Sequence, residues 1–162
     1  MNILISRNGV GKIGKFRFKC SIGKKGVTDQ KFEGDNKTPL GTFPLRFVMY
    51  RKDKLKRFKT NLPLYLIKKS HVCCDDPNNT KYNKIYIKEE ESEKEPLWRK
   101  DSLYNIIIVI GYNDQPVQKN KGSAIFIHLS TKKYAPTKGC VSISLNDMKK
   151  ILSYNIKKIK II

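Results

Sequence analysis

Ile106-Ile107-Ile108-Val109-Ile110 is the longest apolar run in this chain of 162 residues. Five β-branched residues in succession favour a strand over a helix, and the lack of polar alternation indicates a strand that is buried on both faces. The run is far shorter than the roughly 20 residues that a membrane-spanning helix needs. The sequence therefore predicts a central strand of a folded domain and no transmembrane segment.

Alternating apolar and polar segments lie on both sides of this run. Turns rich in Gly, Pro, Asn and Asp separate them, so we expect a series of further strands. These predicted strands cover residues 3–6, 16–22, 42–50, 62–67, 84–88, 122–129, 140–144 and 156–162. The acidic cluster at 89–95 is expected to form an exposed turn or a single helical turn.

One helix is expected near residues 145–153. Ser144 and Asp147 have the spacing of a capping box, and the apolar residues that follow share one helical face. Those residues are Leu145, Met148, Ile151 and Leu152. The fold class is therefore mostly β, a β-sandwich or mixed sheet with one or two short helices. A chain of this length suits a single domain, which we place at residues 1–162.

The charge is strongly positive, with 34 Lys and Arg against 14 Asp and Glu and a formal net charge of +20. Such a charge suggests an anionic partner, such as nucleic acid. Only six of the basic residues are Arg, the residue that specific nucleic-acid readers favour for bidentate base contacts. Lys, Ile and Asn are abundant together, as in proteins from AT-rich genomes. We interpret the charge as a solvated lysine surface that is spread over the domain, with a basic nucleic-acid or anionic-polymer module as the alternative.

His128 and Cys140 form the strongest candidate pair for catalysis. His128 ends one predicted strand and Cys140 begins the next. If these strands are neighbours, the imidazole can accept the proton of a thiol nucleophile. Lys138 would favour the thiolate, and a turn at Gly139 could aim the N–H groups of residues 139 and 140 at a developing oxyanion. The alternative is a cysteine that only packs in the core.

A second cluster, His71-Val72-Cys73-Cys74-Asp75-Asp76, contains residue types that bind zinc. Adjacent cysteines rarely share one tetrahedral site, and the sequence has no second Cys-x-x-Cys pair, so we expect no metal site. A vicinal disulfide or simple loop packing is the preferred interpretation. The two aspartates are expected to form turns before Pro77. The alternative is that they line a substrate cleft and face an ammonium group of the substrate.

Three ordered segments resemble the active-site signature of the YkuD-type L,D-transpeptidase catalytic domain family. Residues 33–44, Glu-Gly-Asp-Asn-Lys-Thr-Pro-Leu-Gly-Thr-Phe-Pro, are similar to its Gly-Asp-x-x-Thr-Pro-x-Gly-x-Phe segment. Residues 122–128, Gly-Ser-Ala-Ile-Phe-Ile-His, resemble the strand that ends in the family's histidine. Residues 136–141, Pro-Thr-Lys-Gly-Cys-Val, are similar to Ser/Thr-His-Gly-Cys. The resemblance spans about residues 20–151 and implies the family's mostly β catalytic fold.

The resemblance also assigns roles to individual residues. It makes Cys140 the nucleophile and His128 the general base, and it gives Thr137 the Ser/Thr position and Gly139 the turn that builds the oxyanion hole. Two residues depart from the family pattern. Lys138 stands where the family has His, and Ser142 stands where Asn or Arg is common. These departures leave substrate choice open.

Four residues are candidates for substrate binding: Lys138, Asp35, Thr38 and Arg99. Asp35 and Thr38 belong to the first matching segment, which we expect to approach the site either as a wall or as a layer behind the residues that touch the substrate. Arg99 could hold a substrate carboxylate as a bidentate fork, or it could form a structural pair with Asp101.

The family reaction implied by the resemblance is acyl transfer on peptidoglycan stem peptides, with no metal or other cofactor. The thiolate attacks the carbonyl of an L-configured residue, diaminopimelate, and expels the terminal D-amino acid. Transfer of the acyl group to an amine makes a transpeptidase, and transfer to water makes an L,D-carboxypeptidase. A catalytically silent domain that binds cell-wall peptide is the alternative. The substrate implies the cell envelope or periplasm; no signal peptide is visible, so a cytoplasmic protein is the other possibility.

Overall fold

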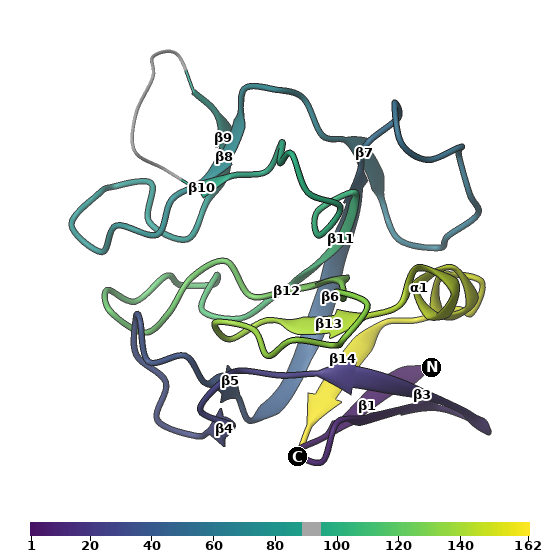
Figure 1. Cartoon of the computed structure of the whole chain (residues 1–162). Coiled ribbons are helices and arrows are strands. Elements are labelled where there is room, and N and C mark those ends of the chain that lie inside the picture. Colours follow the sequence, from purple (N-terminus) through teal and green to yellow (C-terminus); the bar gives the residue numbers. More distant parts are fainter. Residues whose placement is uncertain (89–94) are drawn as a thin grey trace.

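The computed structural model describes residues 1–88 and 95–162. Eight strands form a closed, mixed β-barrel (Figure 1). Around the ring they are β11 (Ile106–Ile110), β12 (Phe126–Leu129), β13 (Val141–Ile143), β3 (Phe16–Ser21), β2 (Val10–Ile13), β1 (Asn2–Ser6), β14 (Lys158–Ile161) and β6 (Gly41–Tyr50). The mostly β fold class is confirmed.

The ring closes through β6, which is ten residues long. Its first residues, from Gly41 to Pro44, pair with β14, and its later residues, from Leu45 to Tyr50, pair with β11. One strand can therefore join both ends of the sheet. A short strand, β7 (Leu64–Leu66), adds to the end of β6 in the parallel direction.

The predicted central strand β11 separates two hydrophobic clusters. Ile106, Ile108 and Ile110 belong to the cluster inside the barrel, whereas Ile107 belongs to a second cluster on the outer face. The strand is therefore buried on both faces, as its sequence predicts. Each fully buried Ile stabilises the fold by about 1.5–3 kcal/mol relative to exposure.

A small antiparallel sheet covers the outer cluster, above the barrel in Figure 1. It contains β8 (His71–Cys73), β9 (Ile85–Ile87) and β10 (Glu95–Pro96). Two further strands, β4 (Val27–Thr28) and β5 (Thr38–Pro39), form a parallel pair beside the barrel. Cys73 in β8 and Leu97 directly after β10 are at most 1% exposed, and both pack in the outer cluster.

The single helix among the described residues is α1 (Leu145–Leu152). The Ser144 hydroxyl caps it by accepting a 3.1 Å hydrogen bond from the N–H of Asp147, and it donates to the carboxylate of the same residue. Met148, Ile151 and Leu152 are buried against the barrel, and Leu145 packs at the edge of the same cluster.

Several strand boundaries differ from the sequence expectations. The strand expected from residue 122 starts only at Phe126, because Ala124 has a φ of 52° and interrupts the extended backbone. Strand β2 was not predicted, and residues 71–73, for which a vicinal disulfide or loop packing was preferred, form β8. The acidic cluster expected to form a turn at 89–95 falls almost wholly outside the described residues.

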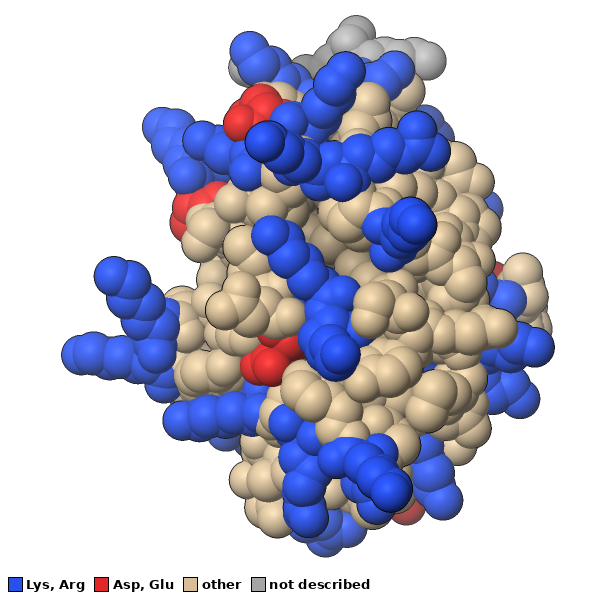
Figure 2. All heavy atoms as spheres, turned by 90° about the vertical axis from the view of Figure 1, so that its right-hand side faces the viewer, with Lys and Arg blue, Asp and Glu red and all other residues tan. Residues whose placement is uncertain are grey.

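The basic side chains are scattered over the face shown in Figure 2, with uncharged surface between them. They do not form one continuous groove on that face, which agrees with the expectation of a diffuse lysine surface. Within the described ranges, no helix is long and apolar enough to cross a membrane.

Candidate active site

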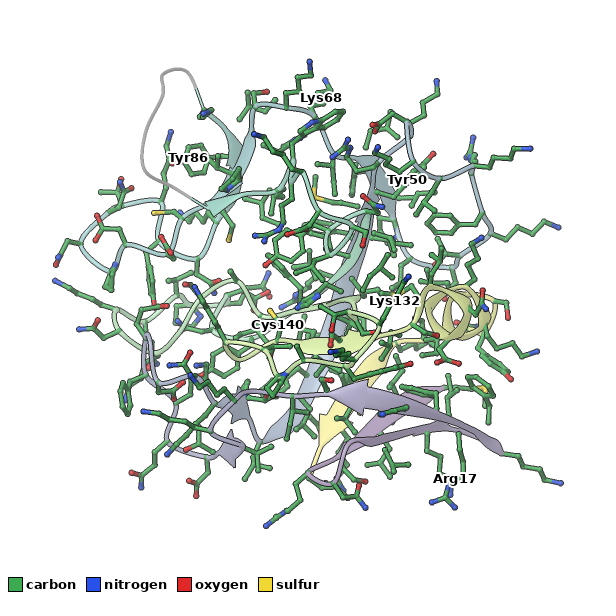
Figure 3. The ribbon with its side chains drawn as sticks, viewed as in Figure 1. Arg17, Tyr50, Lys68, Tyr86, Lys132 and Cys140 are labelled. Atoms are coloured by element: carbon green, nitrogen blue, oxygen red, sulfur yellow. The ribbon has the colours of Figure 1, made fainter. Side chains whose placement is uncertain are left out.

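The candidate residues lie on the outer face of two parallel barrel strands. His128 in β12 is the direct partner of Ser142 in β13, so their side chains are neighbours on one face. Cys140 comes just before β13, two residues from Ser142, and it packs against the outer hydrophobic cluster. Figure 3 shows Cys140 beside these two strands. The intervening residues point into the barrel: Ile127, Leu129, Val141 and Ile143.

A pocket of about 670 Å³ opens at this face. Its walls include both His128 and Cys140, together with Thr137, Lys138, Gly139 and Arg99. The structure therefore brings six of the eight sequence-predicted site residues into one cavity. Asp35 and Thr38 are not among the residues that line it.

His128 has the protonation pattern that a general base needs. Its Nδ1 lies 2.8 Å from the backbone carbonyl oxygen of Leu129. A carbonyl can only accept, so Nδ1 of the neutral ring carries the proton and Nε2 keeps its lone pair. Burial lowers the pKa of His128, and the Leu129 hydrogen bond only partly opposes this effect. The imidazole is therefore neutral at neutral pH.

The sulfur of Cys140 is held by the backbone that leads into β12. The thiol donates to the carbonyl of Ala124 at 3.1 Å, and the N–H of Phe126 donates to the sulfur at 3.4 Å. The positive φ of Ala124, unusual for a residue with a side chain, lets this carbonyl face the sulfur. The backbone thus fixes the position of the thiol.

Two threonines hold the carbonyl of Cys140. The Thr137 hydroxyl donates to this oxygen at 2.6 Å, and the Thr38 hydroxyl donates to it at 3.4 Å. Each hydroxyl also accepts a backbone N–H: Thr137 from Gly139 at 3.1 Å and Thr38 from Gly23 at 2.8 Å. The expectation that the Gly139 N–H faces the pocket is therefore wrong for this structure, because Thr137 already accepts that hydrogen bond.

Gly139 is required by the tight approach of a neighbouring loop. Its φ is 142°, and a Cβ atom added here would lie 2.9 Å from the carbonyl oxygen of Lys37. Any side chain would therefore push this loop away from the Cys140 turn.

Asp35 supports that loop from behind the pocket wall. Its carboxylate pairs with the Lys31 ammonium at 2.5 Å, with both side chains at most 5% exposed, and it accepts the N–H groups of Phe32 and Lys37. Burial alone would raise the pKa of Asp35, but these hydrogen bonds hold it below its usual value. The arrangement gives Asp35 and Thr38 supporting positions rather than the direct substrate contacts expected from the sequence.

Arg99 forms the structural pair with Asp101 that was one of its two expected roles. Its guanidinium forms a bidentate pair with Asp101, with a shortest distance of 2.7 Å, and the residue also lines the pocket. The same guanidinium lies over the Tyr104 ring, whose edge packs against His128 with ring centroids 5.4 Å apart. Arg99 therefore connects the pocket rim to the imidazole.

The cluster at residues 71–76 forms β8 and the start of the loop that follows it, and Cys73 packs in the outer hydrophobic cluster. The Nδ1 of His71 accepts the N–H of Lys68 at 2.8 Å, and the two cysteines are buried and are not joined in a disulfide. In the described part of the chain, no group of three or more His, Cys, Asp or Glu is placed to hold a metal ion. Asp76 forms the expected turn by accepting the N–H of Asn78, whereas Asp75 lines the pocket.

Sequence reasoning missed several residues of the pocket. Lys31, Ser123 and Tyr104 line it from three distant segments; Ser123 lies in the second matching segment, but no role was assigned to it. Glu33 begins the first matching segment, but it lies outside the quoted family pattern. Ser142, noted only as a departure from the family pattern, is 1% exposed, and its hydroxyl has no hydrogen-bond partner among the described residues.

Comparison with known proteins gives a family and a fold for this chain. A model of the L,D-transpeptidase catalytic domain family, YkuD, matches residues 3–158. Two crystal structures of the helical cell shape determining protein Pgp2 from Campylobacter jejuni, one of them a point mutant, share the fold with a TM-score of 0.50 at 17% and 16% identity. The match covers 99% of this chain and 46% of those chains, so this chain spans about half their length. No curated protein sequence matches the chain significantly.

Proposed function

The chain belongs to the YkuD family of L,D-transpeptidase catalytic domains, and from this premise we propose that it is a cysteine acyltransferase acting on peptidoglycan stem peptides. Cys140 is the nucleophile and His128 is the general base. The substrate is a stem peptide with an L-configured diamino residue, diaminopimelate, followed by a terminal D-amino acid. Such a substrate places the site of action in the cell envelope.

The first half-reaction forms a thioester. The Nε2 of His128 takes the thiol proton, and the sulfur attacks the carbonyl carbon of the diamino residue. The tetrahedral intermediate collapses as the bond to the D-amino acid breaks, and His128 returns the proton to the leaving amine. The backbone N–H of Cys140 is the oxyanion donor that this proposal requires, because the Gly139 N–H is bonded to Thr137.

The second half-reaction releases the acyl group. An acceptor amine attacks the thioester carbonyl, His128 accepts its proton, and the thiolate leaves and is reprotonated. An amine from a second stem peptide gives a cross-link, whereas water gives an L,D-carboxypeptidase product. Neither half-reaction needs a redox partner.

One observation carries the proposal. His128 in β12 and Cys140, directly before the neighbouring parallel strand β13, line the same pocket, while the hydrogen bond from Nδ1 to Leu129 leaves Nε2 as the basic atom. A cysteine and a histidine that only filled space would need neither a shared opening nor a fixed tautomer.

The test is covalent labelling followed by turnover. A carbapenem should add to the intact protein with one-to-one stoichiometry, and the adduct should be absent in Cys140→Ala. With a tetrapeptide stem, release of the terminal D-amino acid should stop in Cys140→Ala and fall by about 100-fold or more in His128→Ala. Full activity in Cys140→Ala would reject the mechanism.

A silent peptide-binding domain is the second candidate. Two observations favour it: Lys138 replaces the family histidine, and the resting thiol donates to Ala124. In that case the tetrapeptide binds, but neither the carbapenem adduct nor D-amino acid release is detected.

A further inference from the structure

Glu33 places a fixed carboxylate in the wall of the pocket. The hydroxyls of Tyr82 and Ser123 both donate to its Oε2 atom, the latter at 2.8 Å. The backbone N–H of Glu33 donates to the carbonyl of Asn120 at 2.9 Å, and the Tyr82 oxygen accepts the N–H of Gly122 at 3.0 Å. Side chain and backbone are thus both held, which suits a binding group rather than a mobile surface residue.

The partners of this carboxylate are electrically neutral. Four other described carboxylates have a cationic partner: Asp35 with Lys31, Asp53 with Arg51, Asp101 with Arg99, and Asp114 with Arg46. The hydrogen bonds of the Glu33 side chain among the described residues come from two hydroxyls. Burial, with a further contribution from Glu33, raises the pKa of Tyr82, so this donor stays protonated and neutral. The negative charge of Glu33 therefore remains available to a ligand.

The distance between the Glu33 carboxylate and the Cys140 sulfur limits the length of a ligand that contacts both. Ser123, which holds the carboxylate, is followed directly by Ala124, whose carbonyl accepts the Cys140 thiol. Two hydrogen bonds, of 2.8 and 3.1 Å, and the Ser123–Ala124 segment thus connect the carboxylate to the sulfur, so the two groups lie at most roughly 14 Å apart. A diamino acid side chain places its ammonium ~7 Å from the α-carbonyl carbon when extended, by standard bond lengths. This length lies within the upper limit on the separation of the two protein groups.

A second observation indicates that the pocket takes a polar ligand. The Ser142 hydroxyl, 1% exposed and without a hydrogen-bond partner among the described residues, lines the same pocket. Unsatisfied buried hydroxyls are costly, so this one is explained by a group that binds here.

We propose that Glu33 is a specificity-determining residue that binds an alkylammonium group of the peptide substrate beside Cys140. This proposal rests on the proposed function for the identity of the substrate. The ammonium has two sources, the side chain of the diamino residue in the donor peptide and the amine of the acceptor. In a chain with a net charge of +20, a fixed carboxylate in the pocket offsets the repulsion that either ammonium would otherwise meet.

The first arm of the test measures binding without turnover. Cys140→Ala is titrated by calorimetry with the peptide L-Ala-D-Glu-L-Lys-D-Ala and with the same peptide acetylated on the lysine Nε. The free ammonium should bind roughly 5- to 10-fold more tightly, as expected for a partly buried charge pair. Adding Glu33→Gln should abolish this preference, since Gln keeps an acceptor for both hydroxyls but loses the charge. Asp29→Asn is the matched control, because Asp29 is exposed in the same loop, does not line the pocket, and should leave the preference intact.

The second arm identifies the acceptor as the source. With Cys140 present, the ratio of transfer to an added amine over hydrolysis is measured in the Glu33→Gln variant. If this ratio falls in Glu33→Gln and the two peptides of the first arm bind equally, the ammonium that Glu33 binds is that of the acceptor amine. If the peptides bind equally when Glu33 is intact and the ratio is unchanged in Glu33→Gln, the proposal is overturned. The binding arm uses no catalysis, so a protein that fails to form the carbapenem adduct would reject the acyltransferase mechanism without deciding the role of Glu33.

Discussion

The hydroxyl of Thr137 donates a 2.6 Å hydrogen bond to the carbonyl oxygen of Cys140 while it accepts the N–H of Gly139. One side chain therefore closes the turn that carries the candidate nucleophile. Thr38 makes a longer contact with the same oxygen from β5. Two hydroxyl groups therefore hold the carbonyl of Cys140, while the residue also packs against the outer hydrophobic cluster.

Replacing Thr137 tests this arrangement. Thr137→Val keeps the shape but removes both hydrogen bonds, so we expect the rate of carbapenem adduct formation to fall about 10-fold or more. Thr137→Ser keeps the hydroxyl and should retain a rate close to that of the unmodified protein. Equal rates for Ser and Val would show that the hydroxyl does not orient the nucleophile.

The pH dependence of turnover follows from the burial of His128. Because burial lowers the pKa of this imidazole, His128 stays neutral to a lower pH than an exposed histidine. Activity should be lost as pH falls through that lowered pKa, so the acid limb of kcat/KM should have its midpoint below ~6.5, the ordinary value for histidine. A midpoint at or above that value would contradict a buried, neutral base.

Alkylation should distinguish Cys140 from the other cysteines. Cys20, Cys73 and Cys74 are at most 3% exposed, and burial raises the pKa of Cys20 to about 11. Cys140 is half-buried and lines the pocket, so iodoacetamide should modify it first. Peptide mapping by mass spectrometry at short times is the measurement. Modification of Cys20 at the same rate would show that the barrel opens readily.

The pair of Lys31 and Asp35 should contribute strongly to stability. Asp35→Asn leaves a buried ammonium without its counter-charge, and we expect a loss of about 3–5 kcal/mol in the free energy of unfolding at neutral pH. Asp29→Asn, on the exposed surface of the same loop, should change it by less than ~0.5 kcal/mol. Urea unfolding of both variants measures the difference.

The ion pair between Lys31 and Asp35 also predicts how the free energy of unfolding changes with pH. The pKa of Asp35 is lowered in the folded protein, so its stabilisation is complete above the ordinary Asp pKa of ~3.9 and is lost as pH falls through the lower folded value. The gap in stability between the unmodified protein and Asp35→Asn should therefore narrow in acid. If the difference in unfolding free energy between the two proteins stays constant at low pH, the ion pair is not its cause.

Much of the fold is predictable from local patterns. Residues 106–110 have the exact bounds expected for the central strand, and the capping sequence at Ser144 marks the start of α1. Periodicity identifies these elements because β-branched runs and capping residues act locally. It does not show that β6 pairs with two partners and closes a barrel, since that depends on contacts between residues far apart in the chain.

The candidate site was predictable only in part. His128, Cys140 and the turn between them follow from strand order and from family resemblance. The surrounding residues do not, because Lys31, Glu33 and Ser123 meet only after the barrel has formed. The strained backbone at Ala124 likewise leaves no mark in the sequence Gly-Ser-Ala.

The pairing of β14 between β1 and β6 has a consequence for the order of folding. Residues 158–161 occupy a place in the ring between two strands that are synthesised long before them. Until these residues leave the ribosome, β1 and β6 each present an unpaired edge, and the barrel stays open. The ring that carries β12 and β13 therefore closes only after residues 158–161 have emerged and paired, late in the synthesis of this domain.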